Sequence, residues 1–90
     1  MESKKFKITK SFVDSVPLSH DKQTFYRDSE LTGFALRVTG IKTFVAEKKL
    51  PSGVPCRVTI GQYGLWTVPQ AREQAKEYLL QIAKGINPNN

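Results

Sequence analysis

The segment Phe34-Ala-Leu-Arg-Val-Thr39 decides the fold of this chain. Apolar Phe34, Leu36 and Val38 alternate with smaller or polar residues, which is the period-two pattern of a strand that is buried on one face. Gly40-Ile41 then fits a two-residue hairpin turn, because glycine suits the first central position of a type II′ turn. Residues 42–50 and 56–62 follow as the second and third strands of an antiparallel sheet, with a turn at residues 51–53 between them.

A long helix is predicted after the third strand, from about residue 67 to residue 84. Thr67 and Gln70 have the spacing of a capping box, and Gly85 suits the position after the last turn. An apolar stripe at helical spacing marks the face that packs on the sheet; it consists of Val68, Ala71, Ala75, Leu79 and Ile82. Its partner is the sheet face of Phe34, Leu36, Val38, Phe44, Val58 and Ile60.

The fold class predicted from these elements is α+β. We expect an antiparallel sheet of three strands, or four if residues 23–28 join it, packed on one long C-terminal helix, with a short N-terminal helix at residues 9–16. Residues 1–8 are interpreted as a basic arm or loosely docked tail, and residues 9–85 as a single domain. Residues 86–90 are interpreted as the start of a linker to further domains.

Composition argues against several classes of protein. A chain of 90 residues with one cysteine and one histidine has no disulfide framework, no Cys/His zinc site and little material for a catalytic constellation. No apolar run approaches the roughly 20 residues that span a bilayer. We therefore expect a soluble, intracellular, non-enzymatic domain that needs no cofactor, no metal and no membrane. Its location is expected to be the cytoplasm, and the domain on its own is expected to be monomeric.

The charge is basic and unevenly distributed. Fourteen Lys and Arg against eight Asp and Glu give a net charge of +6. Residues 1–10 carry four lysines and one glutamate, and residues 34–66 carry five basic residues against Glu47 alone. Clustered basic charge with a pI near 9.7 is typical of nucleic-acid binding. It is also compatible with a surface tuned for solubility.

One face of the predicted sheet has no covering element, and this face is the candidate DNA-binding surface. Its basic and hydrogen-bonding residues can contact bases in the major groove, as Arg does with guanine and Thr with a thymine methyl. The candidates on the face are Arg37, Thr43, Val45, Lys49, Arg57 and Thr59. Lys42 and Lys48 at the hairpin tips, and Lys4, Lys5 and Lys7 in the arm, are candidates for phosphate contacts. The competing interpretation is the ordinary solvated face of an antiparallel sheet.

An ordered series of motifs resembles a known family. The series is Asp28-x-x-Leu31-x-Gly33-Phe34-x-Leu36-Arg37-Val38, Gly40-x-Lys42-x-Phe44, Arg57-Val58-Thr59-Ile60-Gly61-x-Tyr63, Ala71-Arg72-x-x-Ala75 and Gly85-Ile86-Asn87-Pro88. Over roughly residues 8–88 it is similar to the N-terminal arm-type DNA-binding domain of phage and genomic-island integrases, which are tyrosine recombinases.

The resemblance implies a function and a position in a larger protein. Such a domain binds arm-type sites beside the crossover site of the attachment DNA, with its sheet in the major groove, inside a bacterial host and in association with its nucleoid. Core-binding and catalytic domains follow it, so this chain is expected to be non-catalytic and Tyr63 and Tyr78 to be structural. The resemblance leaves Arg72 open, either as an anchor of the helix or as a phosphate contact. Glu47 departs from the family pattern, and it would repel phosphate or accept a hydrogen bond from cytosine.

A second class of function is a protein-interaction module. The strand edges or the helix would then contact a neighbouring integrase subunit or a directionality factor.

Overall fold

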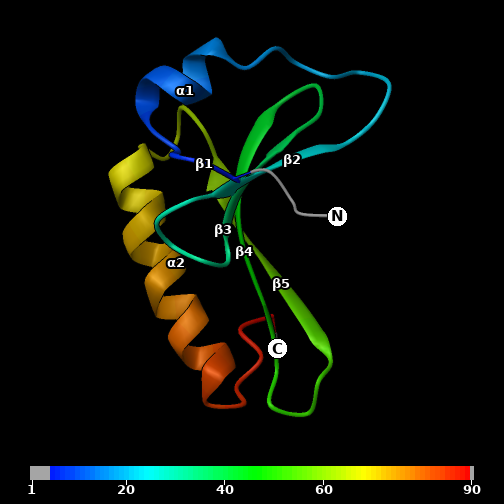
Figure 1. The fold of residues 1–90 in the computed structure, drawn as a ribbon, viewed down its shortest axis with the longest axis vertical. Helices are drawn as coiled ribbons and strands as arrows, with labels where there is room; N and C mark the ends of the chain where they lie inside the picture. The colour runs from blue at the N-terminus through cyan, green and yellow to red at the C-terminus, as the bar shows by residue number, and fades with distance from the viewer. Residues whose placement is uncertain (1–4, 90) are drawn as a thin grey trace.

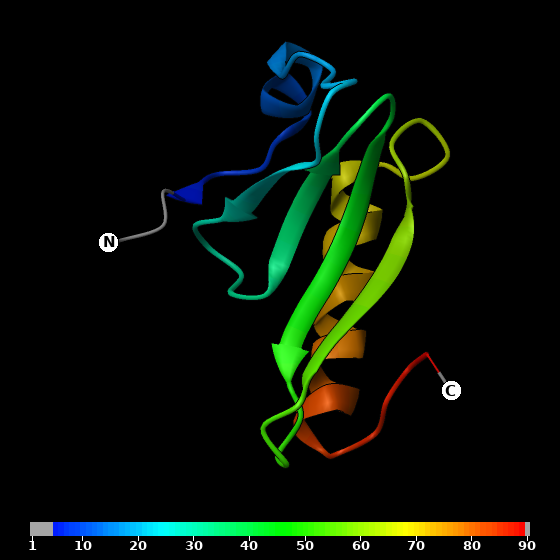
Figure 2. The same cartoon turned by 90° about the vertical axis from the view of Figure 1, so that its right-hand side faces the viewer.

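The computed structural model describes residues 5–89, which form five strands and two helices around one sheet (Figure 1). In chain order the elements are β1 (Lys5–Phe6), α1 (Lys10–Ser15), β2 (Thr24–Asp28), β3 (Phe34–Val38), β4 (Lys42–Lys49), β5 (Pro55–Gln62) and α2 (Val68–Ala83). The strands lie side by side in sequence order, with β1 parallel to β2 and every other pair antiparallel. Helix α2 runs along one face of the sheet, so that Figure 2 shows the strands in front of it.

The predicted α+β class, the short N-terminal helix and the long C-terminal helix are confirmed. The predicted three or four antiparallel strands are wrong in detail, because the sheet has five strands and is mixed. The strand that the sequence did not reveal is β1, whose Lys5 and Phe6 pair with Arg27 and Asp28. Two residues are too few to display a strand periodicity, and their pairing depends on contacts with a distant segment.

Residues 5–8 are therefore integrated into the domain and do not form a loosely docked tail. Ile8 is fully buried in the core, and Phe6 stacks on Phe12 with ring centroids 5.2 Å apart. Residues 1–4, including Lys4, lie outside the described part of the chain.

Helix α2 begins as the sequence indicates. The Thr67 side chain accepts a hydrogen bond from the Gln70 backbone, and the Gln70 side chain accepts one from the Thr67 backbone, which completes the capping box. Fully buried Ala71 and Ala75 present little bulk to the sheet, so the helix approaches it closely. The core between the two layers contains the predicted apolar face of β3, β4 and β5, extended by Ile8, Val13, Val16 and Ala46.

A bulge shapes the end of β5. Phe44 pairs with Gly61 and Val45 pairs with Thr59, which leaves Ile60 as an extra residue. The Trp66 indole packs directly over Gly61, where a Cβ atom would lie 2.1 Å from the indole nitrogen Nε1. Glycine at residue 61 is thus required by close packing of the loop that leads into α2.

After Gly85 the chain turns back along β5 (Figure 2). The Asn89 side-chain amide donates to the Arg57 carbonyl at 2.8 Å, and the Cys56 thiol lies 3.5 Å from the Asn87 side-chain oxygen. Residues 86–89 were predicted as the start of a linker. Within this segment, Asn87 and Asn89 contact the edge strand β5. Within residues 5–89 no helix is long and apolar enough to cross a membrane, and no three potential metal ligands cluster.

Candidate nucleic-acid interface

The sheet face opposite α2 carries side chains from four strands, and we call it the open face. Strand alternation and cross-strand register place on it Phe25, Arg27, Ala35, Arg37, Thr43, Val45, Glu47, Lys49, Arg57 and Thr59. Arg27, Ala35, Val45 and Thr59 form one row across the strands, and Phe25, Arg37 and Thr43 form part of the next. All six residues predicted for this face therefore share it.

An ion-pair cluster occupies the middle of the open face. Glu47 Oε1 lies 2.9 Å from Arg27 Nη2, and Glu47 Oε2 lies 3.0 Å from Arg57 Nη2. Arg57 also donates from Nε to Oε2 at 3.1 Å. The Arg57 guanidinium lies over the Phe25 ring, 4.5 Å from its centroid, in a cation–π contact.

This cluster covers the two central strands. Phe25 belongs to β2 and Arg57 to β5, so a contact between them must pass over β3 and β4, which lie between. Ala35, Thr43 and Val45 are accordingly buried, with exposed fractions of 1%, 4% and 0%. The Arg27 and Arg57 side chains remain 43% and 46% exposed. The outer layer of the open face is thus formed by long side chains, and Thr43 and Val45 lie beneath it.

The predicted phosphate contacts are distributed over different parts of the molecule. Lys5 pairs with Arg27 in the parallel register and extends the edge of the open face, whereas Lys7 lies 3.8 Å from Glu30. Lys42 turns toward α1 and donates from Nζ to the Val13 carbonyl at 2.5 Å. Lys48 is exposed at the end of β4, and alternation directs it to the same side as Ala46, away from Lys49.

Sequence reasoning missed Phe25 and Arg27 as members of the surface. Their signal was present in Gln23-Thr-Phe-Tyr-Arg-Asp28, where Phe25 and Arg27 alternate with Tyr26 and Asp28. Placing them required the pairing of β2 with β3, which sets Phe25 opposite Arg37 and Arg27 opposite Ala35.

Arg72, which the motif left open, anchors α2 to the sheet. It donates to both carboxylate oxygens of Asp28, at 2.6 and 3.2 Å, and to the Ile8 carbonyl at 2.7 Å. Burial of Asp28 would raise its pKa, but hydrogen bonds from Arg72 and from the Ile8 and Leu31 backbone outweigh burial and hold the pKa below its usual 3.8. The guanidinium also lies 5.1 Å from the centroid of the Phe34 ring.

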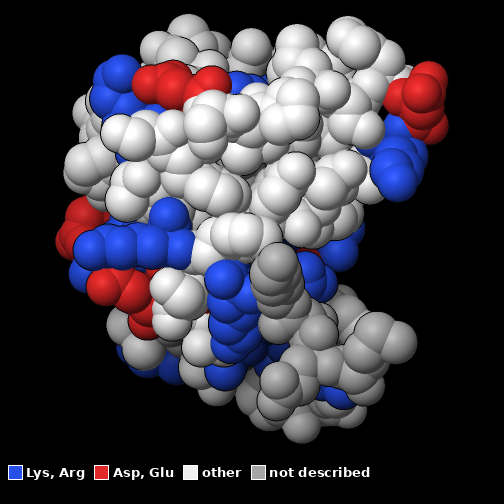
Figure 3. All heavy atoms as spheres, turned by 45° about the horizontal axis from the view of Figure 1, so that its top comes forward, with Lys and Arg blue, Asp and Glu red and all other residues white. Residues whose placement is uncertain are grey.

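Many of the other charges are paired. Figure 3, which views the α1 end of the molecule, shows carboxylates beside Lys and Arg at several places around a broad uncharged area. Lys10 with Asp14 and Lys76 with Glu73 are such pairs, at 2.9 and 2.8 Å. The net charge of +6 is therefore not spread as one uniform positive field over this end.

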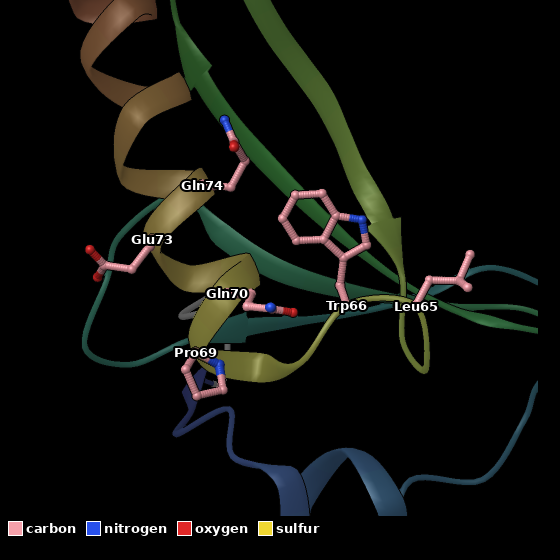
Figure 4. Close-up of a pocket in the computed structure, with 6 residues that line it drawn as sticks. All are labelled: Leu65, Trp66, Pro69, Gln70, Glu73 and Gln74. Carbon is pink, nitrogen blue, oxygen red and sulfur yellow. The ribbon is translucent and has the colours of Figure 1, made fainter.

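A hollow lies apart from the open face, between the β5–α2 loop and the first turns of α2 (Figure 4). It is shallow, encloses about 640 Å³ and is lined by Leu65, Trp66, Pro69, Gln70, Glu73 and Gln74. Glu73 is the one ionisable lining residue, and its carboxylate points away from Trp66 (Figure 4). The hollow thus lacks the paired acid and base that a catalytic site needs.

Comparison with known proteins decides the family. Residues 8–90 match the model of the arm DNA-binding domain. The chain belongs to the arm DNA-binding domain family. It is also 38% identical over 68 residues to the prophage integrase IntF of Escherichia coli (strain K12), a match that covers 74% of this chain and 14% of that integrase. No solved structure matches the chain.

Membership of the arm DNA-binding domain family confirms the resemblance drawn from the motifs. The matched residues include all five elements from β2 to α2, and so include every strand of the open face. The chain spans about one seventh of the length of the curated relative that it matches.

Proposed function

We propose that this chain binds duplex DNA at arm-type sites of an attachment DNA, with the open face of its sheet in the major groove. The observation that carries the proposal is the convergence of Arg27, Arg37 and Arg57, from three different strands, on the sheet face that is left uncovered by the helices of residues 5–89. Such a cluster matches the electrostatic footprint of a DNA-binding surface. The family of the chain supports the same conclusion.

Strands β2 to β5, which form the open face, are antiparallel to their neighbours. A twisted antiparallel sheet can enter the major groove, which is about 12 Å wide. We propose that Arg27, Arg37, Arg57 and Thr59 face base edges and that Lys49 contacts the backbone. Thr43 and Val45 reach bases only if the side chains above them move, since both are buried.

Flanking lysines would contribute contacts to phosphate. Lys5, Lys7 and Lys48 are exposed and are proposed to bind the backbone on either side of the groove. Lys42 is a weaker candidate, because its ammonium group is held by the Val13 carbonyl.

For the longer protein, we propose that this non-catalytic domain positions an integrase for site-specific recombination in a bacterial cytoplasm. The support is the similarity to a prophage integrase, of which the matched part is 14%. Cutting and rejoining of DNA would then reside in other domains, and other integrase subunits or accessory proteins would act alongside this one.

The test is a titration of labelled duplex DNA from beside the attachment core at increasing salt, with shuffled duplex for comparison. The double reversal Lys49→Glu with Arg57→Glu should abolish specific binding, because it places negative charge on the open face. The matched control, Lys76→Glu with Lys84→Glu, makes the same change in net charge in α2 and at its C-cap, on the other side of the sheet.

Circular dichroism should show both double variants folded. Equal loss of binding in the two variants would mean that net charge alone governs the affinity. Unchanged affinity of the open-face variant would refute this face as the DNA-binding surface.

A further inference from the structure

Glu47 is the one carboxylate on the open face as defined above, and it lies where negative charge opposes DNA binding. A carboxylate near the backbone of DNA repels phosphate, and this one also cancels part of the charge of two arginines. Its side chain is only 20% exposed and is held on both sides. Glu47 therefore lowers the electrostatic attraction between the open face and DNA, so a functional role for it must lie in something other than affinity.

The geometry divides the two carboxylate oxygens between two strands. Oε1 forms an ion pair with Arg27 on β2, and Oε2 forms an ion pair with Arg57 on β5 and accepts a hydrogen bond from its Nε, so one side chain on β4 holds two guanidinium groups. Each arginine retains further N–H donors that Glu47 does not use, since a guanidinium group carries five.

The backbone leaves room for this arrangement. Arg27 must reach across β3 to meet Glu47, and the intervening residues are Ala35 and Gly33. Gly33 has a φ of +101° and accepts a backbone hydrogen bond from Glu47 at 2.8 Å. A Cβ atom at residue 33 would lie 2.7 Å from Leu79 Cδ2 of α2 and 2.8 Å from the Glu47 carbonyl oxygen, so close packing against the helix and the β4 backbone requires glycine there. On the open face, the side chain between Arg27 and Glu47 is therefore the small Ala35.

We propose that Glu47 is a positioning residue that sets sequence discrimination, by fixing Arg27 and Arg57 in the orientation that reads the correct bases. The proposal rests on the function proposed above for the open face. Arginines held in place before binding lose less conformational entropy on contact with the correct site. On an incorrect sequence the same arginines cannot turn freely to phosphates, so non-specific binding is penalised. Phe25 supports the same orientation by stacking on Arg57.

The experiment compares three variants of the 90-residue chain. Glu47→Gln removes the charge, Glu47→Asp keeps the charge but shortens the side chain so that it cannot reach both arginines, and Glu77→Gln removes one charge from α2 as the control. The specific probe is the duplex that wild-type protein enriches from a random-sequence pool, and the non-specific probe is its shuffled form. Thermal unfolding confirms that each variant is folded.

We expect Glu47→Gln to bind shuffled duplex more tightly than wild type and to lower the ratio of specific to non-specific affinity by about tenfold or more, the size of one lost bidentate base contact. Glu47→Asp should also lower the ratio of specific to non-specific affinity, because the released arginines lose their orientation for the correct bases and become free to turn to phosphates. Its gain on shuffled duplex should be smaller than that of Glu47→Gln, because the negative charge is conserved. Glu77→Gln should keep the wild-type ratio.

Three results would overturn the inference. If Glu47→Gln raises the affinity for the specific and the shuffled duplex by the same factor, the residue acts through charge alone. If Glu47→Asp keeps the wild-type ratio, positioning is not involved. If the wild-type protein enriches no sequence from the random pool, the proposed sequence-specific DNA binding fails, and the inference about Glu47 fails with it. If the wild-type protein enriches a sequence but the Glu47 variants keep the wild-type ratio, only the inference about Glu47 fails.

Discussion

Asp28 receives both terminal nitrogens of the Arg72 guanidinium, at 2.6 and 3.2 Å, across 44 residues of sequence. Asp28 is the last residue of β2, and Arg72 is in the first half of α2, so the pair ties the sheet to the helix. Asp28 also accepts the Ile8 backbone N–H at 2.9 Å and the Leu31 N–H at 2.6 Å. One buried carboxylate thus joins the N-terminal segment, the β2–β3 turn and α2.

Removing the charge of Asp28 should destabilise the domain strongly. Asp28→Asn leaves Arg72 facing a neutral amide and disrupts the backbone hydrogen bonds, and breaking a buried ion pair costs about 3–5 kcal/mol. Urea unfolding followed by circular dichroism measures the loss. The control Lys76→Ala breaks only an exposed pair and should leave the midpoint nearly unchanged. Equal midpoints for the two variants would contradict the anchoring role.

The contribution of Asp28 should also depend on pH. The carboxyl has a pKa below 3.8 in the folded protein, so the unfolded chain takes up its proton at higher pH than the folded one. The stabilisation is therefore complete above about pH 5 and is lost as the pH falls through the folded pKa. The difference in unfolding free energy between wild type and Asp28→Asn should shrink from about pH 6 to about pH 2. A constant difference would refute this linkage.

Gly61 can be tested with Trp66 as the reporter, because it is the one tryptophan in the chain. In Gly61→Ala the new Cβ atom would lie 2.1 Å from the indole Nε1, so the ring must move away. We expect a red shift of the fluorescence and a loss of stability of about 1–3 kcal/mol, which is typical of overpacking. Gly40→Ala is the control, since its nearest contact would be His20 at 3.5 Å. An unshifted spectrum would contradict the packing.

Lys42 should contribute to the stability of the fold, and Lys49 to the affinity for DNA. Lys42→Ala removes the hydrogen bond to the Val13 carbonyl and should lower stability with little change in the salt dependence of DNA binding. Lys49→Ala should weaken binding across all sequences and reduce the slope of log K against log salt by about 1. The two measurements are a thermal melt and a salt titration. A reduced slope for Lys42→Ala would show that this lysine contacts phosphate instead.

Tyr63 should ionise late. Its hydroxyl donates to Asp14 Oδ1 at 2.8 Å, and this hydrogen bond raises the pKa of Tyr63 above 10.0. Hydrogen bonds from Lys10 and then from Tyr63 lower the pKa of Asp14. Because the folded pKa of Tyr63 is raised, this stabilisation is present below about pH 10 and is lost as the pH rises through the folded pKa. An ultraviolet titration should show Tyr63 ionising at higher pH in the wild-type protein than in Asp14→Asn. An unchanged titration in the variant would exclude this hydrogen bond.

Local pattern was sufficient for both helices, for strands β3 to β5 and for the direction of most of their side chains. The alternation in residues 34–39, the capping box at Thr67 and the alanines of α2 act within a few residues, so they can be read directly from the chain. The same alternation placed Arg37, Lys49, Arg57 and Thr59 on one face of the sheet. The basic charge of residues 34–66 is likewise a property of the sequence alone.

The tertiary structure decided whatever depends on residues far apart in sequence. Strand β1 exists because Lys5 and Phe6 find β2, and Arg72 is an anchor because the fold brings Asp28 to it. The cover over Thr43 and Val45 arises because twist and strand order bring Phe25 and Arg57 together above them. The chain alone specifies which residues face one side of a strand. Which of these residues are exposed is determined only by packing across strands. Exposure depends on the length and charge of side chains on neighbouring strands, and those strands are distant in sequence.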